Sequence, residues 1–305
     1  MRLLDLSGKT IVVTGATSGI GLAATLLYVR SGAFVIGVGR SEKHIQTASD
    51  QIIKEVPKGY IKFLLADLAV QQEVNHLAEK ILNVLKRKHR RKLDVLVNNA
   101  GGYLERKQMT VDGIERTFAV NYLASFLLTN RLMPVLTKGP SPRVLTVTSY
   151  SHRTTPLNLS RICDPWPYIG LLAYKRSKLC NVLFTYELNR RCPQVTAFAV
   201  DPGLVNTAIA SKGGRGISHW VWRRKRLKGT SAEVPAQTLL YLAGDENIDT
   251  QQGFYFKNCS YKNPSKKAKN PQLAEKLWQL SCQLTGVQWL EGSHKTPQNI
   301  YEVSA

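Results

Sequence analysis

Short apolar runs alternate along this chain with longer segments of mixed polarity. The runs are rich in β-branched residues and end at glycine or polar positions, the pattern of strands buried on both faces. The segments between them are long enough for helices that carry the chain from one strand to the next. The predicted strands are 10–14, 33–38, 61–65, 93–97, 143–148, 195–200 and 253–256. The predicted helices are 19–30, 42–55, 70–86, 114–136 and 171–190.

Strand and helix repeated in this order predict a parallel sheet with helices on both faces, the doubly wound α/β architecture of Rossmann type. No linker, internal repeat or low-complexity tract interrupts the pattern. We therefore expect a single domain over residues 1–305. In such a sheet, ligands bind outside the carboxyl ends of the strands, so the loops that follow the strands are the places to look for chemistry.

The first predicted strand runs directly into the glycine-rich sequence TGATSGIG at 14–21. Here Gly15 permits a tight turn, Gly19 lets the backbone approach a pyrophosphate, and Gly21 allows close packing of helix on strand. The next helix offers its N–H groups and positive dipole end to phosphates. Three glycines can also be a plain turn, but the strand–turn–helix context predicts dinucleotide binding. The residues expected to bind are Gly15, Ser18, Gly19, Ile20 and Gly21.

The end of the second strand indicates which dinucleotide. A site for NAD places a carboxylate there for the ribose hydroxyls, whereas a site for NADP needs a cation. Arg40 follows the strand, and its planar fork of donors suits a 2′-phosphate. Glu42 argues against this assignment, but it falls in the first turn of the next predicted helix, where acidic residues are common. The sequence therefore predicts NADP.

Composition narrows the class of protein. The chain has 305 residues, 43% of them hydrophobic, with 42 Lys and Arg against 21 Asp and Glu and a net charge of +21. The five cysteines form no CxxC pair and the six histidines have no ligand spacing, so we expect neither a disulfide framework nor a bound metal. No stretch has the composition of a secretion signal or a spanning helix. We expect a cytoplasmic protein that is not secreted.

Most of the net charge lies in three segments without an acidic residue, namely 86–92, 212–228 and 257–269, which carry six, seven and five Lys or Arg. Three interpretations stay open for them: solvated loops, an anionic membrane surface, or nucleic acid. The segment 212–228 also carries tryptophans, a composition typical of membrane interfaces. Nucleic acid is the least favoured, because no recognition motif accompanies the charges.

Tyr174 and Lys178 lie four residues apart on a predicted helix and therefore on one face. A phenol with a pKa near 10 is a poor acid or base at neutral pH. An ammonium group one turn away, together with a positively charged nicotinamide, would favour the phenolate. Such a pair is common by chance, so on its own it indicates little.

In chain order, the glycine loop, Asp67-Leu68, NNAG at 98–101, Asn121, Ser149, YKRSK at 174–178 and DPGLVNT at 201–207 resemble the motifs of the short-chain dehydrogenase/reductase family. The resemblance covers roughly residues 8–284 and is strongest to the retinol-dehydrogenase-like subgroup. It implies that Tyr174 is the general acid/base, Lys178 holds the nicotinamide ribose, Ser149 orients the substrate oxygen, and Asn121 kinks its helix and holds a water. It implies further cofactor contacts or support from Asp67, Leu68, Asn98, Pro202, Gly203, Val205 and Thr207.

The chain departs from the family pattern in several places. Gly102 follows the NNAG motif and suggests local looseness. Twenty-five positions separate Ser149 from Tyr174, about twice the commoner interval, and this insertion is expected to border the substrate entrance. The subgroup's N-terminal membrane anchor is not expected, because the first strand begins by residue 10. We interpret His152 as a plain loop histidine and Cys180 as a core residue. Residues 204–230 are expected to form a lid over the substrate.

These observations together predict an NADP(H)-dependent oxidoreductase for a lipophilic alcohol or carbonyl compound such as a retinoid, polyprenoid or steroid. A catalytically silent NADP-binding regulator is the main alternative. Peripheral attachment to the endoplasmic reticulum or a lipid droplet is expected to use Arg223, Arg224, Lys225 and Arg226. The sequence leaves the oligomeric state open, with a homo-oligomer among the alternatives.

Overall fold

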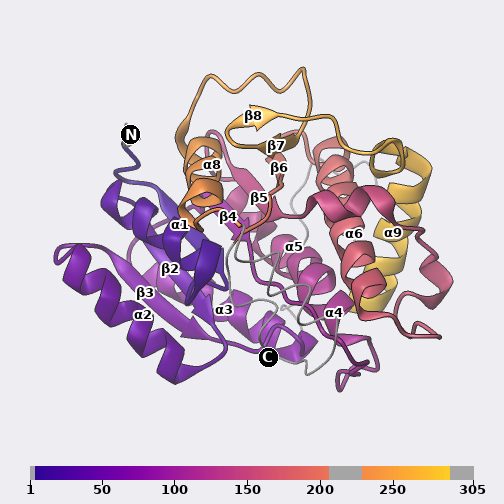
Figure 1. Ribbon diagram of the computed structural model, residues 1–305. Coiled ribbons are helices and arrows are strands. Elements are labelled where there is room, and N and C mark those ends of the chain that lie inside the picture. Colours follow the sequence, from indigo (N-terminus) through magenta and orange to yellow (C-terminus); the bar gives the residue numbers. More distant parts are fainter. Residues whose placement is uncertain (1–3, 206–228, 289–305) are drawn as a thin grey trace, which may run out of the picture.

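The computed structural model describes residues 4–205 and 229–288. In these ranges a central sheet lies between two layers of helices (Figure 1). The strands are β1 Thr10–Thr14, β2 Phe34–Gly39, β3 Ile61–Leu65, β4 Val95–Asn98, β5 Arg143–Val147, β6 Thr196–Val200, β7 Tyr255–Lys257 and β8 Ser260–Tyr261. The helices are α1 Gly19–Arg30, α2 Glu42–Glu55, α3 Gln71–Arg87, α4 Arg116–Phe118, α5 Ala124–Leu136, α6 Gly170–Arg191, α8 Glu233–Gly244 and α9 Pro271–Thr285.

The strand order is β3-β2-β1-β4-β5-β6-β7-β8, and every neighbouring pair is parallel except β7 with β8. The doubly wound α/β prediction is therefore confirmed, and the described ranges add the short antiparallel β8 and the helices α8 and α9 to the predicted elements. Strands β1 and β3 and helices α1 and α2 begin and end at the predicted residues. The remaining predicted boundaries differ by one or two residues, apart from the interrupted helix at 114–136.

Residues alternate across the sheet because successive side chains of a strand point to opposite faces. Val12 of β1 belongs to the core that α3, α5, α6 and α9 cover, whereas Ile11 and Val13 belong to the core under α1 and α8. Strands β1, β2, β4 and β5 are thus buried on both faces, which explains why their apolar runs in the sequence are continuous.

The predicted helix 114–136 is broken into three parts. The single turn α4 passes into a π-helical turn, Ala119–Leu123, before α5 begins. A π-turn inserts an extra residue into the helix and is frequent at functional sites. The residue at its centre is Asn121, so the backbone irregularity coincides with a residue that the family resemblance singles out.

In two of the basic segments most Lys and Arg side chains are exposed, but at least one cation of each contacts the rest of the fold. At the amino end of β1, the guanidinium of Arg90 donates to the carbonyl of Gly8 (2.8 Å) and lies 5.1 Å from the centre of the Phe34 ring. In the segment 257–269, Lys267 donates to the carbonyl of Thr155 (3.1 Å) across the carboxyl edge of the sheet. These two segments therefore sit at opposite edges of the sheet, as predicted. Residues 212–228 lie outside the described ranges.

One aromatic cluster joins α5, α6 and α9. The Trp278 ring is 2% exposed and lies 5.0 Å from the Phe126 ring and 5.9 Å from the Phe184 ring, centre to centre.

Replacing Trp278 by Ala is expected to lower the free energy of unfolding by roughly 3–5 kcal/mol, because it leaves a cavity where the three helices meet. The matched control is Trp166→Ala, since Trp166 is 75% exposed and its loss is expected to cost less than about 0.5 kcal/mol. Urea unfolding measures both, and equal losses would contradict the assignment.

Candidate active site

The loops that follow β1 to β6 meet at the carboxyl edge of the sheet. Strands β1 and β4 lie side by side, and the chain proceeds from them in opposite directions across the sheet. This arrangement creates a crevice position that open α/β sheets use for ligands. Most residues predicted from the motifs lie at or after these strand ends, whereas Asn121 comes from the π-helical turn and Tyr174 and Lys178 come from α6. Lys178 reaches the end of β5 at the carbonyl of Val147.

The glycine loop has the backbone shape that only glycine adopts easily. Gly15 and Gly19 have φ angles of +67° and +54°, in the left-handed region. A Cβ on Gly21 would lie 2.1 Å from the carbonyl oxygen of Gly15. Each glycine of the motif is thus required by geometry.

The N-terminus of α1 is open to an anion. Its N-cap residue, Ser18, makes no side-chain capping hydrogen bond, and the first turn contains no acidic residue. The first N–H groups of a helix have no partner within the helix, and the dipole favours a negative charge at this end. The free backbone N–H groups at the start of α1 therefore fit the pyrophosphate of a dinucleotide.

Thr14 and Asn99 tie the glycine loop to the NNAG loop, a function that sequence reasoning missed. The Thr14 hydroxyl accepts from the amides of Asn99 and Ala100, both at 3.0 Å, and the Asn99 side chain donates to the carbonyl of Thr14 (2.8 Å). Thr14 and Asn99 are 85 positions apart in the chain. The second asparagine of the motif is the available signal, whereas the family resemblance assigns a role only to the first.

The end of β2 leaves Arg40 exposed, directly before α2. Ser41 caps α2, and Glu42 lies in the first helical turn, as the sequence indicated. No salt bridge within the described ranges involves Arg40. The guanidinium is therefore available to an anionic group at this edge.

Asp67 follows β3, and both of its carboxylate oxygens have partners. One accepts from Arg116 of α4 (2.9 Å) and the other from the amide of Ala69 (3.0 Å), while the Asp67 amide donates to Glu73 (2.7 Å). Sequence reasoning did not predict Arg116. Because it fixes the orientation of the carboxylate, an adenine amine at this site would meet Asp67 in a single orientation.

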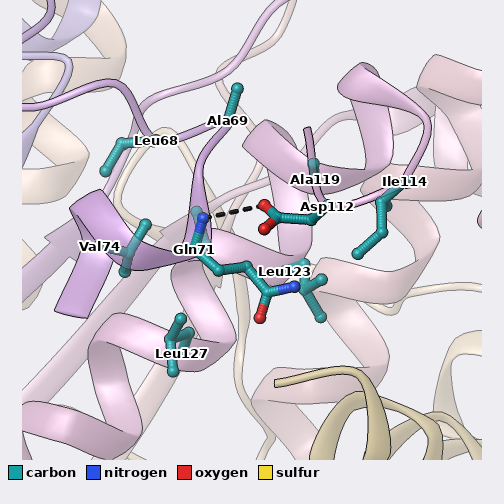
Figure 2. Close-up of a pocket in the computed structure, with 10 residues that line it drawn as sticks. Leu68, Ala69, Gln71, Val74, Asp112, Ile114, Ala119, Leu123 and Leu127 are labelled. Atoms are coloured by element: carbon teal, nitrogen blue, oxygen red, sulfur yellow. Dashed lines mark hydrogen bonds between the residues drawn. The ribbon is translucent and has the colours of Figure 1, made fainter. Parts of the chain in front are cut away.

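Beside Asp67, the side chain of Leu68 lines a small and mostly apolar pocket between α3 and α5 (Figure 2). Val74 and Leu123 form part of the same lining, and the Gln71 amide donates to Asp112 at its rim (3.0 Å). Leu68 therefore packs with its side chain, which leaves its backbone for contact with a cofactor.

Tyr174 and Ser149 meet at the carboxyl end of β5. The Ser149 hydroxyl accepts from the amide and the hydroxyl of Ser151, at 3.2 and 3.1 Å, and it is near enough to the phenol of Tyr174 to lower its pKa. Because the Ser149 oxygen accepts two hydrogen bonds from Ser151, the proton of the Ser149 hydroxyl must point away from Ser151. Ser151 is a further residue that the motifs did not indicate.

Burial raises the pKa of Tyr174 to about 12, the bond to Ser149 lowers it to a smaller extent, and the charge of Asp201 raises it further. The ammonium of Lys178 lies 5.7 Å from the centre of the Tyr174 ring. In the cofactor-free protein, burial is the largest influence on the phenol, and the expectation that Lys178 together with a bound nicotinamide favours the phenolate stays a prediction.

Lys178 is buried, and its ammonium donates to the carbonyl of Val147 (3.0 Å). Burial lowers the pKa of Lys178 to about 8. The backbone holds this lysine in place as well, since the Thr148 hydroxyl donates to the Lys178 carbonyl (2.7 Å). The side chain of Asn181 donates to the same Val147 carbonyl (3.2 Å).

The side chain of Asn121 is hydrogen-bonded to the loop that follows the NNAG motif. Its amide oxygen accepts from the Gly102 amide (2.7 Å), and its amide nitrogen donates to the Gly102 carbonyl (2.9 Å) and to Ser177 (2.9 Å). The expectation of local looseness at Gly102 is therefore wrong. A Cβ on Gly101 would lie 3.1 Å from Asn121 Oδ1 and 3.3 Å from Lys178 Nζ, so a glycine here lets both side chains approach.

Some of the remaining predicted residues support the backbone around the site, and others lie outside the described ranges. The side chain of Asn98 donates to Thr129 of α5 (3.0 Å), which braces β4. Pro202 and Gly203 turn the chain after β6, with Gly203 at a φ of +70°. Val205 pairs with Thr230, so the two ends of the predicted lid lie side by side. Thr207 and the basic run 223–226 lie outside the described ranges.

His152 and Cys180 differ in how far they match the sequence interpretation. Cys180 is fully buried in the core, as predicted. His152 is also buried, at 1% exposure, and both of its ring nitrogens are hydrogen-bonded. The interpretation of His152 as a plain loop histidine is therefore wrong.

The described ranges contain neither a metal-binding cluster nor a membrane span. No group of three His, Cys, Asp or Glu side chains there could hold a metal ion. None of the helices in the same ranges is long and apolar enough to cross a membrane.

The burial of the Lys178 ammonium is expected to make the free energy of unfolding depend on pH. With a pKa near 10.5 unfolded and about 8 folded, it opposes folding fully below about pH 8, and the penalty shrinks as the pH rises towards 10.5. Lys178→Met is therefore expected to stabilise the protein at about pH 7, by up to roughly 3 kcal/mol, and by less at about pH 9.5. Thermal unfolding at both pH values measures the difference, with exposed Lys80→Met as control. A pH-independent loss of stability would contradict this.

Comparison with known proteins agrees with the geometry. Residues 9–216 match the short chain dehydrogenase family. Retinol dehydrogenase 12 of Mus musculus is 33% identical over 94% of this chain and 89% of its own length. The WW domain-containing oxidoreductase of Homo sapiens is 36% identical over 92% and 69%, and polyprenol dehydrogenase of Homo sapiens is 33% identical over 92% and 86%.

Solved structures show the same fold. An uncharacterized protein from Mycobacterium paratuberculosis has a TM-score of 0.74 and 29% identity, covering 94% of this chain and 97% of its own. A short chain dehydrogenase from Shigella flexneri complexed with NADP has a TM-score of 0.63 and 21% identity, covering 85% and 100%. From its motifs, its fold and these relatives, this chain belongs to the short-chain dehydrogenase family of oxidoreductases.

Proposed function

We propose that the chain is an NADP(H)-dependent oxidoreductase for a lipophilic alcohol and its carbonyl partner. The observation that carries the proposal is the meeting of Tyr174, Ser149 and Lys178 at the carboxyl edge, beside an open helix N-terminus. The nicotinamide cofactor would supply or accept the hydride. The chain's own side chains would bind and orient the substrate oxygen and move its proton.

In the direction of reduction, Tyr174 supplies the proton that the substrate oxygen receives. The phenol is protonated at neutral pH, as a general acid requires, and Lys178 together with a bound nicotinamide would lower its raised pKa towards the range in which proton transfer is efficient. The hydroxyl of Ser149, fixed by Ser151, is placed to orient that oxygen and to stabilise its developing charge. Lys178 contributes a positive charge below its pKa of about 8, which would help the phenolate once the proton has left.

The preference for NADP rests on Arg40. It is exposed directly after β2, where a 2′-phosphate would lie, and the nearby Glu42 is taken up in the first turn of α2. A guanidinium can bind such a phosphate with two parallel hydrogen bonds. Reduction is then the favoured direction, if NADPH is the form bound in the cell.

The substrate class rests on the surroundings of Tyr174. The ring of Tyr103 lies 6.4 Å from the Tyr174 ring in an edge-on arrangement, and Leu204 is 41% exposed in the loop after β6. Tyr150, next to Ser149, is also exposed. An aromatic ring beside the phenol, and exposed apolar side chains in loops at the same edge of the sheet, suit an apolar substrate. Two relatives are named for retinol and polyprenol, which are alcohols of this kind.

The first test is NADPH oxidation with retinal, a steroid ketone and a polyprenal, repeated with NADH. We expect turnover with at least one of them, and a fall of about 10²–10⁴-fold in kcat for Tyr174→Phe with unchanged affinity for NADPH. Wild-type protein that binds NADPH but reduces nothing would favour the silent regulator instead.

Arg40 can be tested separately. Replacing it by Leu is expected to weaken NADPH binding roughly 10- to 100-fold, as the loss of charge-assisted hydrogen bonds implies, and to leave NADH binding unchanged. Lys54→Met at the far end of α2 is the control. Equal effects on the two cofactors would contradict a role in recognising the 2′-phosphate.

We also propose attachment to an anionic membrane surface, through Arg223, Arg224, Lys225 and Arg226. Its support is composition, since basic residues and tryptophans occur together in 212–228 and each basic residue near such a surface contributes roughly 1 kcal/mol. Flotation with phosphatidylserine vesicles is expected to fall strongly when all four residues become Gln. Equal flotation of both proteins would contradict the proposal, and equal retention on DNA would indicate nonspecific attraction.

A further inference from the structure

His152 is built into the turn that carries Ser149. It lies in the 3₁₀ turn Tyr150–Thr154, which Ser149 caps, and its side chain is 1% exposed. Its Nδ1 lies 2.8 Å from the carbonyl oxygen of Ser149, and its Nε2 accepts from the amide of Ser265 at 3.2 Å. The imidazole therefore bridges the backbone of the candidate catalytic serine to a loop 113 residues away.

The two partners determine the protonation state of the ring. A carbonyl oxygen can only accept, so Nδ1 must carry the proton, and a backbone amide can only donate, so Nε2 must be bare. His152 is thus neutral and in a single tautomer. A second proton on Nε2 would face the Ser265 N–H and remove that bond.

The loop on the far side of His152 is the basic segment 257–269, and it is fixed to the same turn at two other points. Arg153 donates to the carbonyl of Asn263, and Lys267 donates to the carbonyl of Thr155 (3.1 Å). Cationic side chains that reach backbone carbonyls in this way hold two loops together without using a carboxylate.

The other side of the turn rests on Asp201 and Tyr255. The His152 and Tyr255 rings lie 5.2 Å apart, and the Tyr255 hydroxyl donates to Asp201 (2.9 Å). Asp201 also accepts from the amide of Tyr150 (3.2 Å). The residue after Ser149 is therefore held from outside the turn by Asp201, whereas the carbonyl of Ser149 is held by His152 within it.

We propose that His152 is a positioning residue, whose neutral imidazole aligns the Ser149 hydroxyl with Tyr174 by linking the serine backbone to the basic segment 257–269. The proposal rests on the proposed oxidoreductase function. The role of His152 also explains two of the positive charges of the chain, since Arg153 and Lys267 hold the loop that His152 contacts. A displacement of about 1 Å at a catalytic group can cost about 10²-fold in rate, so the alignment matters.

The surroundings indicate how the link responds to pH. Burial lowers the pKa of His152, with a smaller increase from its bond to Ser149. The link is therefore intact above the ordinary histidine value near 6.5 and is lost only at a lower pH, as Nε2 takes up a proton. The charged and titratable groups around the ring are Arg153 on the same turn, Lys175 on α6, Asp201 after β6, Tyr255 in β7 and Lys267 in the basic segment.

Two amide variants separate the two bonds. The side-chain nitrogen of Asn matches the position of Nδ1, and the side-chain oxygen of Gln can occupy the position of Nε2. His152→Asn is expected to lose about tenfold or more in kcat, because it keeps the bond to Ser149 but breaks the link to the basic segment, and to lose the protection of the Ser265 amide from hydrogen exchange. His152→Gln is expected to keep that protection and to lose about tenfold or more in kcat, with little change in affinity for NADPH.

The pH profile gives a readout that loss of packing would not produce. The acidic limb of kcat is expected to move to lower pH in His152→Asn, because that variant has no imidazole to protonate. Exposed His76→Ala on α3 is the control, and thermal unfolding checks that each variant is folded. Full kcat in either His152→Asn or His152→Gln, or an unchanged acidic limb in His152→Asn, would overturn the proposal. Inactive wild-type protein would instead overturn the proposed function, and Ser265 exchange would still test the bridge.

Discussion

The ammonium of Lys178 is buried without a carboxylate partner in the described part of the chain, and much of the surrounding structure serves to hold it. A buried charge is costly unless polar groups replace the lost water. Here the carbonyl of Val147 at the end of β5 accepts from it, while Thr148 secures the lysine's own backbone. The charge, the strand end and helix α6 therefore depend on one another.

The same constraint explains the irregular backbone nearby. The π-turn at Ala119–Leu123 brings Asn121 against Gly102, and the absence of a side chain at Gly101 lets Asn121 and Lys178 come close. Burial dominates at this site, so the phenol of Tyr174 holds its proton more strongly than an exposed tyrosine does. Stability is given up where function needs buried polar groups, a common feature of active sites. The loops of the carboxyl edge supply the remaining contacts.

Much of this arrangement could be predicted from the sequence, for identifiable reasons. Continuous apolar runs and intervening helices determine a doubly wound sheet, and Gly15, Gly19 and Gly21 are dictated by local backbone geometry. The strand ends then place Arg40 and Ser149 at one edge. Local patterns contain this information because they depend on period and conformation, not on distant partners.

Apart from Ser151, which lies two positions from its partner Ser149, the contacts that sequence reasoning missed at the site join distant segments. Thr14 with Asn99, Asp67 with Arg116 and His152 with Ser265 are 49 to 113 positions apart. No local pattern records such pairs. The pKa of Tyr174 could not be predicted from the sequence for a related reason, because burial is a property of the whole fold. Only the spacing between Tyr174 and Lys178 is visible in the sequence.

The most direct test is the ionisation of Tyr174 in the cofactor-free protein. Tyrosine labelled at Cζ reports phenol and phenolate by its NMR chemical shift, and comparison with Tyr174→Phe identifies the signal. We predict that Tyr174 is still a phenol at about pH 10.5, above the ordinary tyrosine pKa near 10, because burial raises its pKa to about 12. A Tyr174 that has become phenolate well below pH 10 would contradict the claim that burial governs proton affinity at this site.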